Sequence, residues 1–411
     1  MNEDSLEHKA FNGFILNDNF IRQSEETALV KPKINATAGV VMLNGKLMAR
    51  NSVMSFYTEK TPENVVGYSP MTGIKELRDV WKKRILNHND LIQSDISLPM
   101  VTSGITSSLA IVNTLFAGKN SRLFLPEMRW EAYDNIFKDA EKVIFYDSYL
   151  NDLPFERMND MCSNNKDIRF IIVLNYPNNP TGWSPSERDL IQLSQSLLKI
   201  ASTGRKIVVV VDDAYTGLFF EQQIQSPFAY FCNLENILAV KCDGATKECL
   251  MWGQRIGFIT YGLKHAKAED YEYLENLTKA AIRGLYSSPC TASQNALLKS
   301  EKSGLSEKES VEITSLLLSR YLEFKRVISQ LGKKEFISPL PFNSGYFMCF
   351  KVGCNANTLR KKLLLEKEIG VISYDDKHIR VAWSSVDCPD IEKLITEIYK
   401  TAKELYEKDV V

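Results

Sequence analysis

Lys247 stands where an amine can take part in chemistry rather than remain a solvated surface charge. The apolar run 236–240 leads to a turn of small residues, 243–246, which delivers Lys247, and a strand-like segment begins again at Arg255. An amine at the mouth of a sheet, with small neighbours that let a flat ligand approach, is what Schiff-base chemistry with pyridoxal phosphate requires. Arg255 follows eight positions later, and its planar guanidinium suits a pair of phosphate oxygens. The chain holds 50 Lys and Arg residues, most of them expected at the surface, so the pair needs support from other segments.

Short apolar runs alternate with helical stretches from residue 99 onward. The runs cover residues 100–102, 122–125, 142–145, 170–174, 206–211 and 237–240. Runs buried on both faces and separated by helices are typical of a mostly parallel sheet with helices on each side. We therefore predict a three-layer α/β domain built on a mostly parallel, seven-stranded sheet. In such sheets ligands bind beyond the carboxyl ends of the strands, so the residues that follow each run are the candidates.

Two of these strand ends predict contacts to a flat, anionic ligand. A helix predicted over 107–116 is preceded by Gly, Ser and Thr residues. The N–H groups at its start and the helix dipole make an anion site, to which the Thr106 hydroxyl adds a donor. Ordinary N-capping accounts for the same residues equally well. After the run 122–125 come Trp130 and Tyr133, aromatic residues able to stack on a flat ring.

Two further strand ends carry polar groups. The run 170–174 leads into 175–182, Asn-Tyr-Pro-Asn-Asn-Pro-Thr-Gly, where turn signals predict a rigid, non-helical loop whose amides point at a ligand oxygen. The run 206–211 leads into Asp212 and then Tyr215. A carboxylate at the end of an apolar strand is costly unless it is paired with a cation or a protonated ring nitrogen. Asp212 is predicted to be that partner.

The rest of the chain predicts an arm and two domains. Residues 1–33 are polar with apolar islands and are predicted to be an arm that packs on another surface. We assign 56–305 to a large domain that holds the sheet, and 34–55 with 306–411 to a smaller α+β domain. An amphipathic helix at 310–333 is long enough to bridge both domains. Further elements of the smaller domain are predicted at 343–350, 358–366, 371–374, 379–385 and 390–408.

Composition excludes several classes of protein. The chain has 411 residues, 44% hydrophobic and 25% charged, which is an ordinary globular balance with length for two domains. A net charge of −1 offers no basic surface for nucleic acid or membrane, and we expect neither a signal peptide nor a membrane span. Eight cysteines without a CxxC pair indicate reduced core residues of a cytoplasmic protein. Four distant histidines predict no zinc site.

Several spaced segments together carry a resemblance to a known family. They are Tyr68 with Gly73 and Arg78, the stretches 175–182, 212–217 and 247–257, and Arg380. In their order and spacing the whole chain resembles the class I aminotransferases of the aspartate/aromatic group. The resemblance implies a fold-type I enzyme that uses pyridoxal 5'-phosphate, with a large cofactor domain, a small domain and an obligate homodimer with shared active sites.

The resemblance implies a role for each cofactor residue. Lys247 matches the lysine that forms the Schiff base and then moves the Cα proton, which favours a lowered pKa. Asp212 matches the carboxylate that keeps the ring nitrogen protonated. Tyr215 and Asn179 match groups that bond the ring's phenolic oxygen, and Trp130 matches the aromatic residue that stacks on the ring. The implied phosphate site consists of Ile105, Thr106, Arg255 and, from the neighbouring subunit, Tyr68.

The same resemblance implies a substrate site. Arg380 matches the arginine that clamps the substrate α-carboxylate, with Gly39 and Asn179 lining the site. Arg283 falls where dicarboxylate-specific members bind the distal carboxylate across the dimer interface. A cation favoured by the dipole at the end of a helix is the alternative for Arg283.

Two positions depart from the family pattern. Gly244 stands where many members carry a serine that touches the phosphate, so Thr246 or Thr106 is expected to compensate. Ser288 replaces a common asparagine, which weakens the prediction of an aspartate pocket. Aromatic and Met side chains near the site, among them Tyr346, also suit an aromatic amino acid.

The predicted function is transfer of an amino group between an L-amino acid of the aspartate or aromatic type and a 2-oxo acid such as 2-oxoglutarate, by a ping-pong mechanism. The expected partners are these small molecules and a second copy of the chain. A carbon–sulfur β-lyase or an enzyme like aminocyclopropane-carboxylate synthase is an alternative on the same fold. A non-catalytic, cofactor-bound regulator is a weaker alternative, because the chain offers no helix-turn-helix and no basic face.

Overall fold

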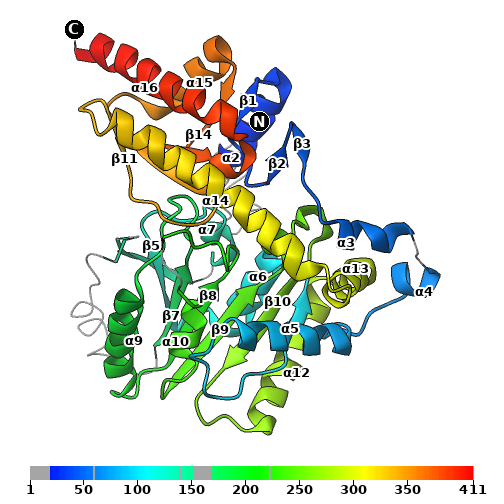
Figure 1. Ribbon diagram of the computed structural model, residues 1–411. Helices are drawn as coiled ribbons and strands as arrows, with labels where there is room; N and C mark the ends of the chain where they lie inside the picture. Colours follow the sequence, from blue (N-terminus) through cyan, green and yellow to red (C-terminus); the bar gives the residue numbers. More distant parts are fainter. Residues whose placement is uncertain are drawn as a thin grey trace, which may run out of the picture.

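The computed structural model describes residues 19–58, 61–138, 140–147, 149–150, 168–221 and 224–410 (Figure 1). A seven-stranded sheet of order β4-β10-β9-β8-β7-β5-β6 forms the centre of the larger part. Strands β5 to β9 pair in parallel, whereas β10 runs antiparallel to both of its neighbours. The predicted mostly parallel, seven-stranded sheet is confirmed. The strands are Met100–Thr102 (β4), Ser121–Pro126 (β5), Glu141–Tyr146 (β6), Arg169–Asn175 (β7), Ile207–Asp212 (β8), Ile237–Asp243 (β9) and Gly257–Gly262 (β10).

Both faces of this sheet are buried under helices, which explains the unbroken apolar runs. Along β8, Val209 and Val211 pack into one hydrophobic cluster, whereas Val208 and Val210 pack into another, as the alternation of a strand requires. The first cluster is covered by α5 (Lys75–Asn87), α9 (Glu187–Ala201), α10 (Pro227–Phe231) and α13 (Thr291–Lys302). The second is covered by α6 (Ile105–Phe116), α7 (Tyr133–Ile136) and α12 (Ala268–Leu285).

A third hydrophobic cluster joins residues near the start of the chain to its last hundred residues. It packs a four-stranded sheet of order β11-β12-β15-β14 against helices, and β1 adds parallel to β13. The division of the chain into a large domain at 56–305 and a smaller domain at 34–55 and 306–411 stays a prediction. The strands are β1 (Ile34–Asn35), β11 (Ile337–Pro339), β12 (Phe347–Val352), β13 (Ile369–Gly370), β14 (Ile372–Ser373) and β15 (His378–Ala382), and the helices are α15 (Ala356–Lys367) and α16 (Cys388–Val410).

Helix α14 (Ser306–Leu331) runs alongside both parts of the molecule (Figure 1). Its buried hydrophobic residues belong to the third cluster, and Ser306 at its start accepts a hydrogen bond from buried Arg50. This is the bridging helix predicted for 310–333, begun a few residues earlier. In the described part of the chain, no helix combines the length and the apolar character that a bilayer crossing requires.

The N-terminal region packs on the four-stranded sheet. Helix α2 (Asn19–Val30) donates a hydrogen bond of 3.0 Å from Gln23 Nε2 to the carbonyl oxygen of Ser373. Residues 19–30 thus contact the four-stranded sheet of the same chain, whereas residues 1–18 lie outside the described part, and the arm over 1–33 stays a prediction. The remaining short elements are β2 (Met42–Leu43), β3 (Lys46–Leu47), α3 (Asn51–Met54), η1 (Ser55–Thr58), α4 (Pro62–Val65), α11 (Ala245–Glu248), η2 (Trp252–Gln254) and η3 (Trp383–Ser385).

Two elements, the strand predicted at 343–350 and the segment predicted at 379–385, have other bounds in the structure. The strand predicted at 343–350 begins only at Phe347, because the N–H groups of Asn343 and Ser344 both bond to the carbonyl oxygen of Gly182 in a neighbouring loop. The segment predicted at 379–385 is strand β15 as far as Ala382 and continues as the single turn η3. Both differences in the bounds arise from tertiary hydrogen bonds or turns, which cannot be predicted from the alternation of apolar residues.

Candidate active site

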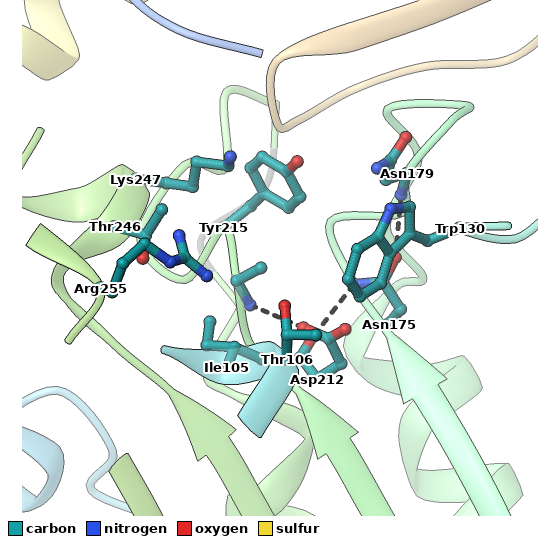
Figure 2. Close-up of a pocket in the computed structure, with 11 residues that line it drawn as sticks. Ile105, Thr106, Trp130, Asn175, Asn179, Asp212, Tyr215, Thr246, Lys247 and Arg255 are labelled. Carbon is teal, nitrogen blue, oxygen red and sulfur yellow. Dashed lines mark hydrogen bonds between the residues drawn. The ribbon is translucent and has the colours of Figure 1, made fainter. Parts of the chain in front are cut away.

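One pocket lies beyond the carboxyl ends of β7, β8 and β9 (Figure 2). Its cavity volume is about 200 Å³. The pocket brings together every residue predicted to contact the cofactor except Tyr68. It is lined by Ile105, Thr106, Trp130, Asn175, Asn179, Asp212, Ala214, Tyr215, Thr246, Lys247 and Arg255.

Lys247 lies in the short helix α11, directly after β9. The Tyr346 hydroxyl donates to the Lys247 carbonyl oxygen at 3.1 Å, and Arg50 donates to the Glu248 carbonyl at 2.9 Å. These two side chains fix the backbone that carries the amine. Burial, followed by the positive charges of Arg255 and Arg380, lowers the pKa of Lys247 to about 8. The expected lowered pKa is therefore present.

Asp212 is the last residue of β8 and is buried. Its Oδ2 accepts a hydrogen bond from the Tyr133 hydroxyl at 2.5 Å, and its Oδ1 accepts from the N–H of Ala214 at 3.2 Å. Burial raises the pKa of Asp212 to about 6, since desolvation outweighs these hydrogen bonds and the charge of Lys247. The carboxylate is thus held in a fixed orientation at the base of the pocket.

Arg255 and the start of α6 form one cationic wall of the pocket. The backbone of Gly104 approaches Arg255 so closely that a β-carbon there would lie 2.6 Å from Nη2. Gly257 in turn lies against Gly104, with room for no side chain between them. The first N–H groups of a helix lack partners within the helix, so those of Ile105 and Thr106, together with the guanidinium, can receive an anion.

The loop after β7 forms the opposite wall. The N–H of Asn179 donates to Asn175 Oδ1 at 2.9 Å, and Asn175 Nδ2 donates to the Asp212 carbonyl at 3.1 Å. Asn178 Nδ2 reaches the carbonyl of Met128 at 3.3 Å, which ties the loop to the segment carrying Trp130. In Figure 2 the Trp130 ring lies beside Asn175 and faces the pocket.

Arg380, on β15, is buried behind Asn179. Its Nη1 donates to Asn179 Oδ1 at 3.2 Å and its Nη2 to the Thr37 carbonyl at 2.9 Å, whereas its buried Nε has no hydrogen-bond partner among the described residues. The rings of Phe20 and Phe347 lie 4.7 and 4.5 Å from the guanidinium carbon. Burial lowers the pKa of Arg380. The guanidinium is therefore flanked by aromatic rings and keeps an unused donor.

Besides Arg380, three predicted site residues do not line the pocket. Gly39 packs under Phe347, whose ring would lie 2.7 Å from a β-carbon at position 39. Tyr68 is 94% exposed. Arg283 is also exposed, at the end of α12, and its Nη1 donates to Ser287 Oγ at 3.0 Å. The last two side chains do not line the pocket of their own chain.

The sequence analysis missed Ala214 and Phe20, predicted the wrong role for Tyr133, and included Asn175 only within the polar loop 175–182. Asn175 ends β7 and Ala214 follows β8, and both line the pocket. Tyr133 was predicted only as a stacking ring, whereas its hydroxyl bonds Asp212. Phe20 had no signal, because no local pattern connects a helix at the N-terminus with an arginine 360 positions later.

The fold is shared with solved aminotransferases. An aminotransferase from Anaerococcus prevotii superposes with a TM-score of 0.82 at 23% identity, over 96% of this chain and 99% of that one. An aspartate aminotransferase double mutant from Thermus thermophilus gives a TM-score of 0.71 at 17% identity, over 98% and 100% of the two chains. The predicted fold-type I architecture is thereby confirmed.

Sequence comparison defines the family. Residues 44–398 match the model for aminotransferase class I and II, and the chain belongs to this family, whose members depend on pyridoxal phosphate. A probable aspartate/prephenate aminotransferase of Aquifex aeolicus is 23% identical over 213 residues, 50% of this chain and 51% of that protein. The mitochondrial aspartate aminotransferase of Saccharomyces cerevisiae is 23% identical over 263 residues, 54% and 57% of the two chains. The matched stretches span about half the length of these relatives.

Proposed function

We propose that the protein is an aminotransferase that moves an amino group between an L-amino acid and a 2-oxo acid in two half-reactions. The observation that carries the proposal is the charge arrangement around the pocket. Among the described residues, Lys247, Arg255 and Arg380 form no salt bridge, and one buried carboxylate, Asp212, lies at the base. Arg380 is buried, Lys247 is half-buried and Arg255 is exposed. Like charges without acidic partners repel one another where they converge, so this arrangement favours a ligand that carries at least two anionic groups.

Pyridoxal phosphate fits this arrangement. When bound, it supplies an aldehyde that condenses with amines and a ring that accepts electrons. The phosphate would lie at Arg255 and the N–H groups of Ile105 and Thr106, and the Lys247 amine would hold the aldehyde carbon. Asp212 would hold the proton on the ring nitrogen.

Arg380 is proposed to bind the α-carboxylate of the substrate. Its unused Nε and the edge of its planar guanidinium suit two carboxylate oxygens, and the flanking rings keep that plane fixed. With a pKa of about 8, a useful fraction of Lys247 is neutral and can take the proton from Cα. Exclusion of water by the buried surroundings would strengthen both interactions.

The protein is further proposed to act as a homodimer. Exposed apolar side chains include Val66 and Tyr68, 79% and 94% exposed, and Leu285, 48% exposed. The loop at Gly67 bonds to the Thr291 hydroxyl, which places it beside the segment that follows α12. A second copy that covers this surface would bring Tyr68 and Arg283 to the neighbouring pocket, where they would add a phosphate contact and a contact to a distal carboxylate.

An amino-donor panel tests the function. Purified protein saturated with pyridoxal phosphate is incubated with each of the twenty amino acids, with and without 2-oxoglutarate, and keto acids and glutamate are measured. We expect glutamate only when the acceptor is present, and no turnover by Lys247→Ala. Lys267→Ala, at a mostly exposed lysine, is the matched control and should retain activity. Formation of pyruvate and ammonia without an acceptor would contradict transamination and would show that the protein catalyses β-elimination.

A further inference from the structure

Tyr133 contacts both the Trp130 ring and the Asp212 carboxylate. It begins α7, three positions after Trp130, and its side chain is completely buried. Its ring meets the Trp130 ring edge to face, with centroids 5.7 Å apart. Its hydroxyl lies 2.5 Å from Asp212 Oδ2. One short element therefore presents both an aromatic wall of the pocket and a hydrogen-bond donor to the buried carboxylate.

The two oxygens of Asp212 are held from different directions. Tyr133 reaches Oδ2 from α7, and the Ala214 N–H reaches Oδ1 from the turn after β8. A carboxylate held in this way cannot rotate, so its free lone pairs keep one direction relative to the pocket. A hydrogen bond donated to a charged oxygen also stabilises the ionised form more than the neutral form.

We propose that Tyr133 is a positioning residue that keeps Asp212 ionised and fixes the direction of its carboxylate toward the ring nitrogen of the cofactor. This inference rests on the proposed role of Asp212. The ring nitrogen keeps its proton only if the carboxylate beside it remains charged. The Tyr133 hydroxyl therefore supports proton movement at the substrate through Asp212, without touching substrate or cofactor itself.

The cofactor-free protein provides the first test. Tyr133→Phe removes a single oxygen, and Tyr261→Phe is a matched control, because Tyr261 is buried in the same hydrophobic cluster and its hydroxyl bonds Thr278 at 2.6 Å. The melting temperatures of both variants and the parent are measured between pH 5 and pH 8. Other charged or titratable groups around Asp212 are unchanged in both variants, namely Asp213, Tyr215, Cys242 and Lys247.

The expected result follows from the sign of the linkage. Asp212 has a folded-state pKa of about 6, above its ordinary value of 3.8, so its ionisation costs stability as pH rises through this window. Removing the donor raises that pKa further, by about one pH unit. The gap between Tyr133→Phe and the parent should therefore widen as pH rises past 6, whereas the gap for Tyr261→Phe should stay constant. A gap for Tyr133→Phe that is independent of pH would overturn the proposal.

The cofactor-bound protein provides the second test. For Tyr133→Phe we expect a dissociation constant for pyridoxal phosphate raised about tenfold and a lower kcat. KM for the amino acid should change little, because Arg380 and its neighbours are untouched. A raised KM with unchanged kcat would contradict the positioning role. Turnover by Lys247→Ala would contradict the proposed function without contradicting the role of Tyr133. The cofactor-free measurement does not depend on that outcome.

Discussion

Gly244 lies directly against Gly257: a β-carbon on Gly244 would come 2.7 Å from the Cα of Gly257 and 2.7 Å from the carbonyl oxygen of Ile256. Both contacts are with backbone atoms, one at the start of β10 and one in the residue before it. Backbone atoms cannot move aside as the end of a flexible side chain can. These contacts give a steric reason for glycine at position 244, where the family resemblance implies a serine. The strand beside Gly244 occupies the place of the side chain.

Gly244→Ser should therefore weaken the site rather than restore a phosphate donor. The substitution forces Gly244, at the start of α11, away from β10 and carries Lys247 with it. We expect a loss of about 1–3 kcal/mol in unfolding free energy and weaker binding of pyridoxal phosphate, measured by denaturant titration and by absorbance. Gly253→Ser is the control, because no atom lies within 4 Å of a β-carbon there. Tighter binding at unchanged stability would refute this reading of the contact.

The Lys247 amine should react at lower pH than an ordinary lysine. Its pKa of about 8 means that half of it is neutral near pH 8, and only the neutral amine attacks an aldehyde. The rate of absorbance change on mixing cofactor-free protein with pyridoxal, which lacks the phosphate, should rise with pH to a midpoint near 8. Arg255→Met should move the midpoint upward because one nearby positive charge is lost. A midpoint near 10 in the parent would contradict the effect of burial.

Much of the site could be predicted because its residues follow strands. Asp212 and Lys247 are read from apolar runs that end in polar or small residues, and the ends of neighbouring strands meet at one edge of the sheet. The two residues lie in one pocket for that reason. Local pattern and topology were sufficient here.

Other parts depend on contacts between distant segments. The Tyr133 hydroxyl bonds Asp212, and the Phe20 ring lies against Arg380, although each pair is far apart in the chain. The position of a tyrosine in the sequence does not show whether its ring or its hydroxyl makes the functional contact. Gly244 is similar, since its neighbour across the sheet, Gly257, is known only once β9 and β10 pair antiparallel.

Arg283→Ala should penalise acidic substrates selectively. The guanidinium is exposed and bonds only the Ser287 hydroxyl among the contacts described, so its loss should not disturb folding. If it meets a distal carboxylate in the neighbouring site, kcat/KM for aspartate and glutamate should fall about tenfold or more, the cost of one charge-assisted bond. Phenylalanine should be unaffected. Lys279→Ala, one turn earlier on α12, is the control, and equal losses for aspartate and phenylalanine would argue against the role.

A second group of charges lies buried beneath the site. Lys241 on β9 donates to Asp213 and lies 3.5 Å from Asp243, and all three side chains are at most 7% exposed. Trp81 Nε1 donates to both oxygens of Asp243, at 3.2 and 3.1 Å. Asp213 follows Asp212 in the chain, and Asp243 begins the turn to Lys247. One ammonium group thus joins the two turns that carry the proposed catalytic groups.

Lys241→Met should be strongly destabilising at pH 8 and less so at pH 5. Burial lowers the pKa of Lys241, but the two carboxylates raise it above its ordinary value, so its stabilising charge persists through neutral pH. Without it, two buried carboxylates remain unpaired, at a cost of about 3–5 kcal/mol. Burial already raises the pKa of Asp243 to about 6, and losing Lys241 raises it further, so acidification to pH 5 neutralises the carboxyl and recovers part of the loss. Urea unfolding at both pH values measures this, and adding Asp213→Asn to the variant should restore part of the stability at pH 8, because only Asp243 then remains as an unpaired carboxylate. An equal loss at pH 5 and pH 8 would mean that Lys241 acts through packing alone.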